Sequence, residues 1–203
     1  MSQIALPLSH QGSSDPDRIV IGSANAAVID ALQKPDSWPY KTAILAGEAR
    51  SGKSLLGKWF ESSGMGDVID GADAMDETEL FHRWNRAQED GRPLLLISDA
   101  EQWDITLPDL RSRLGAALHL EITTPDDEML ASLIETIAIQ RGLALGEGAL
   151  TYLVPRAERS FAAIERLVET IDRLSLERKA PATQGIWRDA LEAMQGPEQG
   201  RLL

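Results

Sequence analysis

The chain has 203 residues, 32 acidic against 20 basic side chains, a formal net charge of −12 and no cysteine. This length favours one hydrophobic core with a small appended domain, and the lack of cysteine excludes a disulfide scaffold and thiolate metal sites. The negative charge disfavours non-specific binding to duplex DNA. With no apolar run long enough for a bilayer, we expect protein or small-ligand partners, no direct DNA binding, no membrane contact and a cytoplasmic location.

The first third of the chain predicts a tail, a helix and a strand. Residues 1–16 are polar and rich in turn residues, which is typical of a flexible tail. A brief extended segment then ends at Ser23, a predicted cap for a helix over residues 24–33 that Pro35 closes. Residues 42–46 form a continuous apolar run of strand length, followed by a glycine loop and a helix to about Phe60.

Strand and helix patterns alternate further along the chain. We predict a short strand at 67–70, a helix from Asp76, a buried strand at 93–98, a short helix at 107–114 and a strand at 117–122. Such alternation predicts an α/β fold with a parallel sheet between helices. After Pro125 only helical patterns follow, at 126–141, 148–156, 160–178 and 183–194. The predicted domains are a tail at 1–16, an α/β base at 17–125, a helical lid at 126–195 and a second tail at 196–203.

The loop between the predicted strand and helix has the pattern G-x-x-x-x-G-K-S. Its glycines allow successive backbone N–H groups to point inward at a phosphate, and the following helix adds the positive end of its dipole. Lys53 reaches the β and γ phosphates, and Ser54 offers a hydroxyl to Mg²⁺. The pattern predicts a site for ADP or ATP with Mg²⁺, and the alternative is a glycine turn that binds nothing. The candidate binding residues here are Gly47, Glu48, Ala49, Arg50, Ser51, Gly52, Lys53, Ser54 and Leu55.

An ATP-hydrolysing loop of this kind also needs a carboxylate at the end of a neighbouring strand. The candidate is Asp70, acting through the Mg²⁺ shell, but Gly71 stands where a catalytic carboxylate is wanted. Asp73 is nearby but is displaced from the catalytic position by a full helical or loop step along the chain, and we interpret it as a helix cap or a solvated loop acid. The sequence therefore supports nucleotide binding better than hydrolysis.

The order of these motifs resembles the AAA+ domain of DnaA-type replication initiators, over roughly residues 18–194. Within that family the chain looks most like the Hda (HdaA) group, regulators that carry the AAA+ domain without the initiator's DNA-binding domain. The resemblance rests on the segments 19–25, 47–54, 68–70, 95–99, 107–114 and 158–160.

The resemblance implies roles for particular positions. Val20, Ile21 and Gly22 match the segment that packs around adenine, and Asp99 falls at the sensor I position. Arg113 matches the arginine finger that acts in trans on a neighbouring subunit's nucleotide, and Arg159 matches the sensor II arginine of the lid. The alternative for each arginine is an ordinary solvated helix residue.

Two features depart from the family pattern. The strand and helix that the family inserts between the loop helix and Asp70 are missing, so we expect a sheet trimmed on one edge. Gly71 replaces the second acidic residue of the Walker B pair. Both features favour a nucleotide that sets the state of the protein, with weak or no intrinsic hydrolysis.

The amino-terminal tail carries a second motif. Gln3, Leu6, Pro7 and Leu8 resemble the peptide by which bacterial replication proteins dock on the β sliding clamp. One amide would hydrogen-bond at a pocket rim, two leucines would fill apolar pockets, and the proline would lower the ordering cost. The alternative is that the apolar residues pack on the domain itself, and self-association that buries the leucines stays open.

These signals together predict a negative regulator of replication initiation. It binds adenine nucleotide, docks on the DNA-loaded clamp, and presents Arg113 to ATP held by the DnaA initiator. Two alternatives remain: an autonomous P-loop ATPase that remodels another protein, and a DNA-binding initiator fragment, which the net charge opposes. Through the clamp, a protein of this kind associates with the nucleoid.

Overall fold

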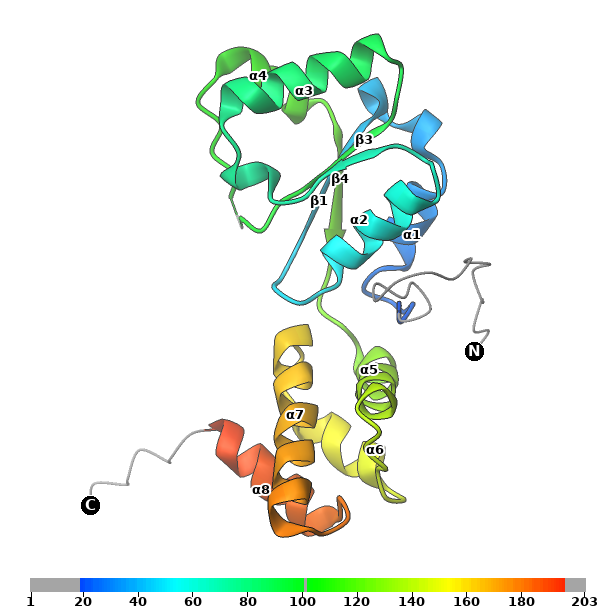
Figure 1. Ribbon diagram of the computed structural model, residues 1–203, viewed down its shortest axis with the longest axis vertical. Coiled ribbons are helices and arrows are strands. Elements are labelled where there is room, and N and C mark those ends of the chain that lie inside the picture. The colour runs from blue at the N-terminus through cyan, green and yellow to red at the C-terminus, as the bar shows by residue number, and fades with distance from the viewer. Residues whose placement is uncertain (1–18, 101, 196–203) are drawn as a thin grey trace, which may run out of the picture. The chain divides into compact units, whose positions relative to one another are not determined.

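The computed structural model describes residues 19–100 and 102–195, and the chain divides into two compact units between Thr123 and Thr124. The first unit contains a parallel sheet flanked by helices, and the described residues of the second unit form helices together with a bridge between Leu145 and Ala182 (Figure 1). The α/β fold class predicted from the alternating strand and helix patterns is confirmed.

The sheet has four parallel strands in the order β2-β3-β1-β4. Every neighbouring pair is parallel, so each connection crosses over and is long enough to contain a helix. β2 forms one edge directly beside β3, in agreement with the predicted trimmed sheet. The strands are β1 (Thr42–Gly47), β2 (Asp67–Ile69), β3 (Leu94–Ile97) and β4 (Leu118–Ile122).

Helices cover both faces of this sheet (Figure 1). Every second residue of a strand points to the same face of the sheet. On one face these residues, such as Ile44 and Leu96, form an apolar cluster with Leu80, Leu110 and Leu114 of the helices. The other face carries α1 and α2. The helices are α1 (Ala26–Leu32), α2 (Lys53–Ser62), α3 (Glu77–Glu89) and α4 (Pro108–Gly115), with short 3-10 helices at Pro35–Ser37, Pro39–Lys41 and Ala72–Ala74.

The helix predicted from Asp76 begins where the sequence places it. The Asp76 carboxylate accepts the N–H groups of Thr78 and Glu79 at the start of α3. The first helix differs from the prediction, because α1 begins at Ala26 and its cap position is Asn25, two residues beyond Ser23. The Asn25 side chain does not cap its own helix, and its actual partners belong to the site described below.

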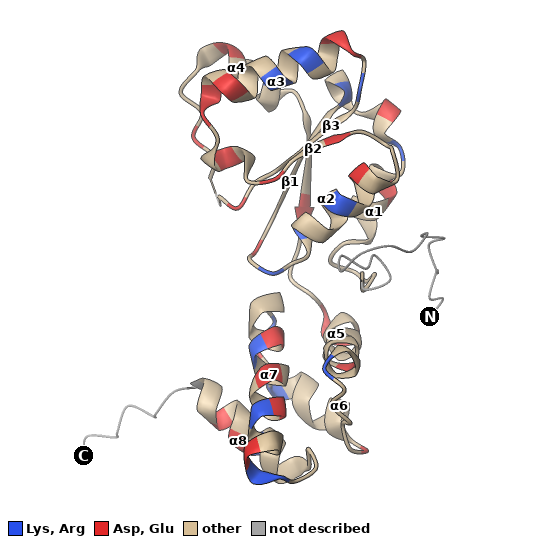
Figure 2. Cartoon of the chain, in the orientation of Figure 1, with Lys and Arg blue, Asp and Glu red and all other residues tan. Residues whose placement is uncertain are grey.

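The second unit buries its own core. Its helices are α5 (Asp127–Gln140), α6 (Ala149–Leu153), α7 (Phe161–Arg178) and α8 (Gln184–Gln195), with a 3-10 turn at Val154–Arg156. α7 follows the helical pattern predicted at 160–178, and its apolar residues Phe161, Ile164, Leu167, Val168 and Ile171 are buried in this unit, with Leu174 partly buried at the end of the row. α3 and α7 both carry charges of both signs, and neither helix presents a continuous basic stripe (Figure 2).

Candidate nucleotide-binding site

The glycine loop joins the end of β1 to the start of α2. Gly47 has φ +150°, and a Cβ there would lie 3.0 Å from the Ile122 carbonyl oxygen, so a side chain would strain the backbone and push this close neighbour away. Gly52 has φ +92° and occupies the cap position of α2. Both glycines of the motif therefore hold backbone conformations that other residues rarely adopt. The loop ends where the positive end of the α2 dipole begins.

The Lys53 side chain is folded into this loop and is only 5% exposed. Its Nζ donates hydrogen bonds to the carbonyl oxygens of Gly47 at 2.7 Å and of Glu48 at 2.9 Å. A third oxygen, Asp99 Oδ1, forms an ion pair with Nζ at 2.9 Å. The sequence predicts Lys53 and Asp99 at the same site, and the structure brings the two side chains into contact.

The loop also contains a buried hydroxyl. Ser51 is 6% exposed, and within the described part of the chain its Oγ has no hydrogen-bond partner. Such a group is costly unless a ligand or water satisfies it. The loop thus offers a phosphate three binding groups: the buried Lys53 ammonium, the Ser51 hydroxyl and the N-terminal end of α2. Ser54, the residue predicted to bind Mg²⁺, is exposed next to them. Bound Mg²⁺ would neutralise phosphate charge there.

Two further carboxylates lie beyond the strand ends. Asp70 follows β2 directly and is exposed, and Gly71 after it has φ +68°. Asp73 lies in the 3-10 turn, and its Oδ1 accepts the N–H of Asp99 at 3.1 Å. Asp73 therefore holds the loop that carries Asp99, which differs from its interpretation as a cap or solvated acid. Pairing between loops of different strands is not visible as a sequence pattern.

The predicted adenine segment is organised by a residue that the sequence analysis missed. The Asn25 side chain is 4% exposed; its Nδ2 donates to the Val20 carbonyl at 2.8 Å, and its Oδ1 accepts the Gly22 N–H at 3.0 Å. These bonds fix the segment in a tight turn, and they leave Ile21 41% exposed. Because these bonds run back to residues three and five positions earlier, the Asx-turn pattern of the sequence does not predict them.

Arg113 lies on α4 and packs against α3. Its Cζ is 4.4 Å from the ring centre of Trp84 and 4.9 Å from that of Phe81, and its Nη1 donates to Asn85 Oδ1 at 3.2 Å. The side chain is half-buried. A guanidinium held over two aromatic rings is more ordered than an ordinary solvated arginine.

The start of α4 depends on a carboxylate from α3. Glu77 accepts hydrogen bonds from Thr106 N–H at 2.8 Å, from the Thr106 hydroxyl at 2.8 Å and from Leu107 N–H at 2.6 Å. These bonds, the Thr106 N–H foremost, hold the pKa of Glu77 below its ordinary value. Leu107 is the cap position of α4 and provides no side-chain cap. Glu77 therefore replaces the missing cap, a role that the sequence analysis did not assign.

Arg159 lies in the second unit, immediately before the α7 cap Ser160. Its Nη2 forms an ion pair with Asp127 Oδ1 at 2.7 Å, and both side chains are more than half exposed. An exposed pair of this kind contributes little to stability and is readily exchanged. The predicted clamp-binding residues Gln3, Leu6, Pro7 and Leu8 lie outside the described residues.

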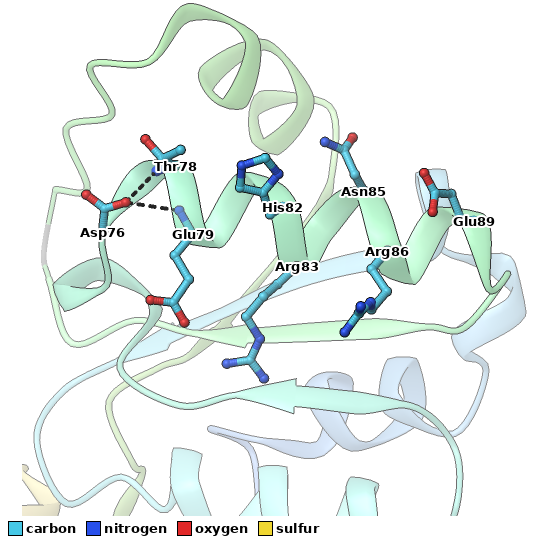
Figure 3. A pocket seen from close by; sticks show the side chains of 8 residues that line it. All are labelled: Asp76, Thr78, Glu79, His82, Arg83, Asn85, Arg86 and Glu89. Atoms are coloured by element: carbon cyan, nitrogen blue, oxygen red, sulfur yellow. Dashed lines mark hydrogen bonds between the residues drawn. The ribbon is translucent and has the colours of Figure 1, made fainter.

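A hollow of about 730 Å³ runs along the outer face of α3. Figure 3 shows that the labelled side chains come from α3 and its cap residue Asp76, with acidic groups toward both ends and Arg83 and Arg86 between them. A single helix face of mixed charge indicates no particular ligand. Among the described residues, no helix has the length and apolar character needed to cross a membrane.

The comparisons with known proteins start from sequence. No protein-family model matches the chain. It is 30% identical over 113 residues to an uncharacterised protein of Haemophilus influenzae, a match that covers 53% of this chain and 49% of that protein. It is 25% identical over 122 residues to the chromosomal replication initiator protein DnaA of Lactiplantibacillus plantarum, covering 58% and 26%. The chain thus spans about half of the first relative and about a quarter of the second.

Solved structures show the same fold. Domain III of DnaA from Thermotoga maritima matches with a TM-score of 0.74 at 15% identity, covering 94% of this chain and 100% of that one. AMPPCP-bound DnaA from Aquifex aeolicus matches with a TM-score of 0.60 at 19% identity, covering 83% and 68%. The chain therefore has the fold of DnaA domain III, as the sequence resemblance predicts. The finer likeness to the Hda group stays a prediction.

Proposed function

We propose that this chain is an AAA+ regulator of chromosomal replication initiation. In this proposal it binds ADP or ATP at its P-loop, docks on the β sliding clamp, and stimulates ATP hydrolysis by the DnaA initiator. Because the initiator would lose its bound ATP, this chain would reduce replication initiation. The observation that carries the proposal is a built phosphate loop on a DnaA domain III fold, with buried Lys53 at its centre.

Nucleotide binding is supported by the loop itself. Lys53, the Ser51 hydroxyl and the N-terminal end of α2 would hold the phosphates, and Ser54 with Asp70 would act through the Mg²⁺ shell. The structurally similar A. aeolicus DnaA is bound to AMPPCP, an ATP analogue. The adenine would pack at the segment that Asn25 holds.

Hydrolysis is assigned to the partner's nucleotide. Gly71 follows Asp70 where a second acid is wanted, which disfavours turnover in this chain's own site. Arg113 would supply positive charge to the phosphoryl group transferred in the initiator, an effect worth about 10³ to 10⁵ in rate where arginine fingers have been dissected. Its aromatic contacts hold the guanidinium in one place, which lowers the ordering cost on entering that site.

The partners remain proposals from the sequence. The motif at residues 3–8 is proposed to bind the clamp, and Arg159 keeps its predicted sensor role. The mixed charges on α3 and α7 agree with recruitment through a protein partner instead of a basic DNA-binding face.

A reconstituted reaction tests the proposal. ATP-loaded DnaA is mixed with clamp loaded on DNA and with this chain, and the conversion of bound ATP to ADP is followed. We expect strong stimulation with all components, and little without the clamp or with the variant Leu6→Ala/Leu8→Ala. Equal hydrolysis with and without this chain would contradict the proposal.

One observation favours a second candidate, an autonomous P-loop ATPase. Asp73 brings an additional carboxylate to the Asp99 loop, beside the Lys53 ion pair. This candidate predicts ATP turnover by the purified chain alone, reduced by Asp73→Asn and abolished by Lys53→Ala. Absence of turnover in a chain that binds ATP would exclude it.

A further inference from the structure

One face of α3 contacts both ends of α4, and the two helices lie side by side (Figure 1). Glu77, in the first turn of α3, accepts the N–H groups of Thr106 and Leu107 immediately before α4. Trp84, two turns further along α3, contacts Arg113 in the last turn of α4. Residues seven positions apart lie on the same face of a helix. The residue that anchors the start of α4 and the residue that receives Arg113 therefore belong to one stripe of α3.

The spacing of these contacts matches on the two helices. Trp84 lies seven residues after Glu77, and Arg113 lies six residues after Leu107. At about 1.5 Å per residue, each spacing corresponds to about 9–11 Å along its helix axis. α4 therefore runs along α3 in the same general direction, so a shift of α4 at its start moves Arg113 across the rings by a similar distance.

The register of α4 on α3 depends on the Glu77 carboxylate. Leu107 at the cap position has no hydrogen-bonding side chain, and Arg111 Nε donates to the Ile105 carbonyl at 2.6 Å, a bond that holds this turn to α4 itself. The buried leucines of α4 pack into the apolar cluster, but apolar contacts are non-directional, whereas hydrogen bonds require a defined geometry. The three bonds that Glu77 accepts, at 2.6–2.8 Å, therefore fix where α4 begins.

We propose that Glu77 is a positioning residue for Arg113: by fixing the start of α4 on α3, it places the guanidinium over Trp84, where it is ready to meet a partner's nucleotide. The inference rests on the proposed function, in which Arg113 acts on ATP held by the initiator. Glu77 acts through α4 and touches no nucleotide itself. Its removal should therefore move Arg113 in a chain that is still folded.

Glu79 provides the matched control. It lies in the same turn of α3, carries the same charge and is exposed. Its position two residues after Glu77 puts it on another face of the helix, away from the start of α4. Glu77→Ala removes a helix cap, so we expect it to melt about 2–6 °C below wild type, whereas Glu79→Ala should melt close to wild type. Glu77→Gln, which keeps one acceptor oxygen, is the milder change at the same position.

The first test observes Arg113 by NMR of the full chain, without nucleotide or partner. Ring currents shift the signals of protons held over an aromatic ring, so the Arg113 side-chain signals of wild type should be displaced from those of exposed arginines. We expect this displacement to be kept in Glu79→Ala, to fall below half in Glu77→Ala and to be intermediate in Glu77→Gln. An unchanged displacement in the folded Glu77 variants would overturn the inference.

The second test uses the reconstituted reaction with ATP-loaded DnaA and clamp on DNA. A misplacement of about 1 Å can cost about a hundredfold in rate, and we expect Glu77→Ala to lose at least about tenfold of the stimulation while Glu79→Ala keeps it. In an Arg113→Ala background, Glu77→Ala should cost none of the remaining stimulation, because it acts through that arginine. A further loss in the double variant would overturn the inference.

The outcomes separate this inference from the proposed function. If the Arg113 signals move in Glu77→Ala while wild type does not stimulate hydrolysis, the proposed function fails and the placement of Arg113 by Glu77 stands. If wild type stimulates hydrolysis and a folded Glu77→Ala variant stimulates it equally, only the inference is overturned.

Discussion

The guanidinium of Arg113 lies over the indole ring of Trp84, with Cζ 4.4 Å from the ring centre. Trp84 is itself buried, and its Nε1 donates to the Thr42 hydroxyl at the start of β1 at 3.1 Å. The arginine proposed to act on a partner is therefore connected through α3 to the central strand. Its placement depends on how α3 packs on the sheet.

The Trp84–Thr42 hydrogen bond is expected to stabilise the first unit. Trp84→Phe keeps most of the apolar volume but removes the donor, and Thr42→Val removes the acceptor. In a double-mutant cycle followed by urea unfolding, we expect a coupling free energy of about 0.5–1.5 kcal/mol. Additive effects of the two changes would show that the bond does not contribute.

The Glu77 contacts predict a dependence of stability on pH. The pKa of Glu77 is lower in the folded protein than its unfolded value of about 4.3, so its stabilising effect is present above that value and is lost as pH falls through the folded pKa. The melting-temperature difference between wild type and Glu77→Gln should be largest near neutral pH and shrink below about pH 4.

Glu89→Gln, an exposed change near the other end of α3, controls for the loss of one charge from this helix. A difference between wild type and Glu77→Gln that stays constant from pH 7 to pH 3 would contradict the capping role.

Two glycines predict opposite effects of the same substitution. A Cβ at Gly66 would lie 2.4 Å from the Pro93 carbonyl oxygen, so Gly66→Ala should lower the free energy of unfolding by about 1–3 kcal/mol. At Gly115, in the last turn of α4, a Cβ meets nothing within 4 Å. Gly115→Ala should raise the free energy of unfolding by about 0.5–1 kcal/mol. Urea unfolding of both variants tests the close packing of Gly66 against the Pro93 carbonyl.

Nucleotide binding should depend on Lys53 far more than on Lys58, the other lysine of α2. Lys53→Ala removes a buried ammonium inside the loop, and we expect at least about tenfold weaker ADP binding. Lys58→Ala, an exposed change on the same helix, is the matched control and should bind ADP like wild type. Similar losses in both variants would point to a general electrostatic effect instead of a phosphate site.

Much of the fold could be predicted from local patterns. The apolar runs at β1 and β3, the glycine loop and the caps Asp76, Asp126 and Ser160 each have a signal within a few residues. The α/β class follows, because parallel strands need helical crossovers. The start of α1 was misplaced, since Ser23 and Asn25 are both good cap residues and only tertiary contacts select between them.

The site was predicted only in part. The P-loop, Asp99 and Arg113 are visible as motifs, but their partners are not. Arg113 meets Trp84 across 29 positions because α4 packs against α3, and Asp73 meets Asp99 across 26 positions because they follow the neighbouring strands β2 and β3. Such contacts depend on topology and side-chain direction, which no local pattern contains.

The most direct test of the central proposal follows the nucleotide held by the initiator. ATP-loaded DnaA and clamp on DNA are mixed with wild type, with Arg113→Ala, or with Arg83→Ala as a control for an exposed arginine of α3, each checked for folding by its melting temperature. The proposal predicts rapid conversion of the initiator's ATP to ADP with wild type and Arg83→Ala, and a loss of most of that stimulation with Arg113→Ala. Undiminished conversion by a folded Arg113→Ala variant would contradict it.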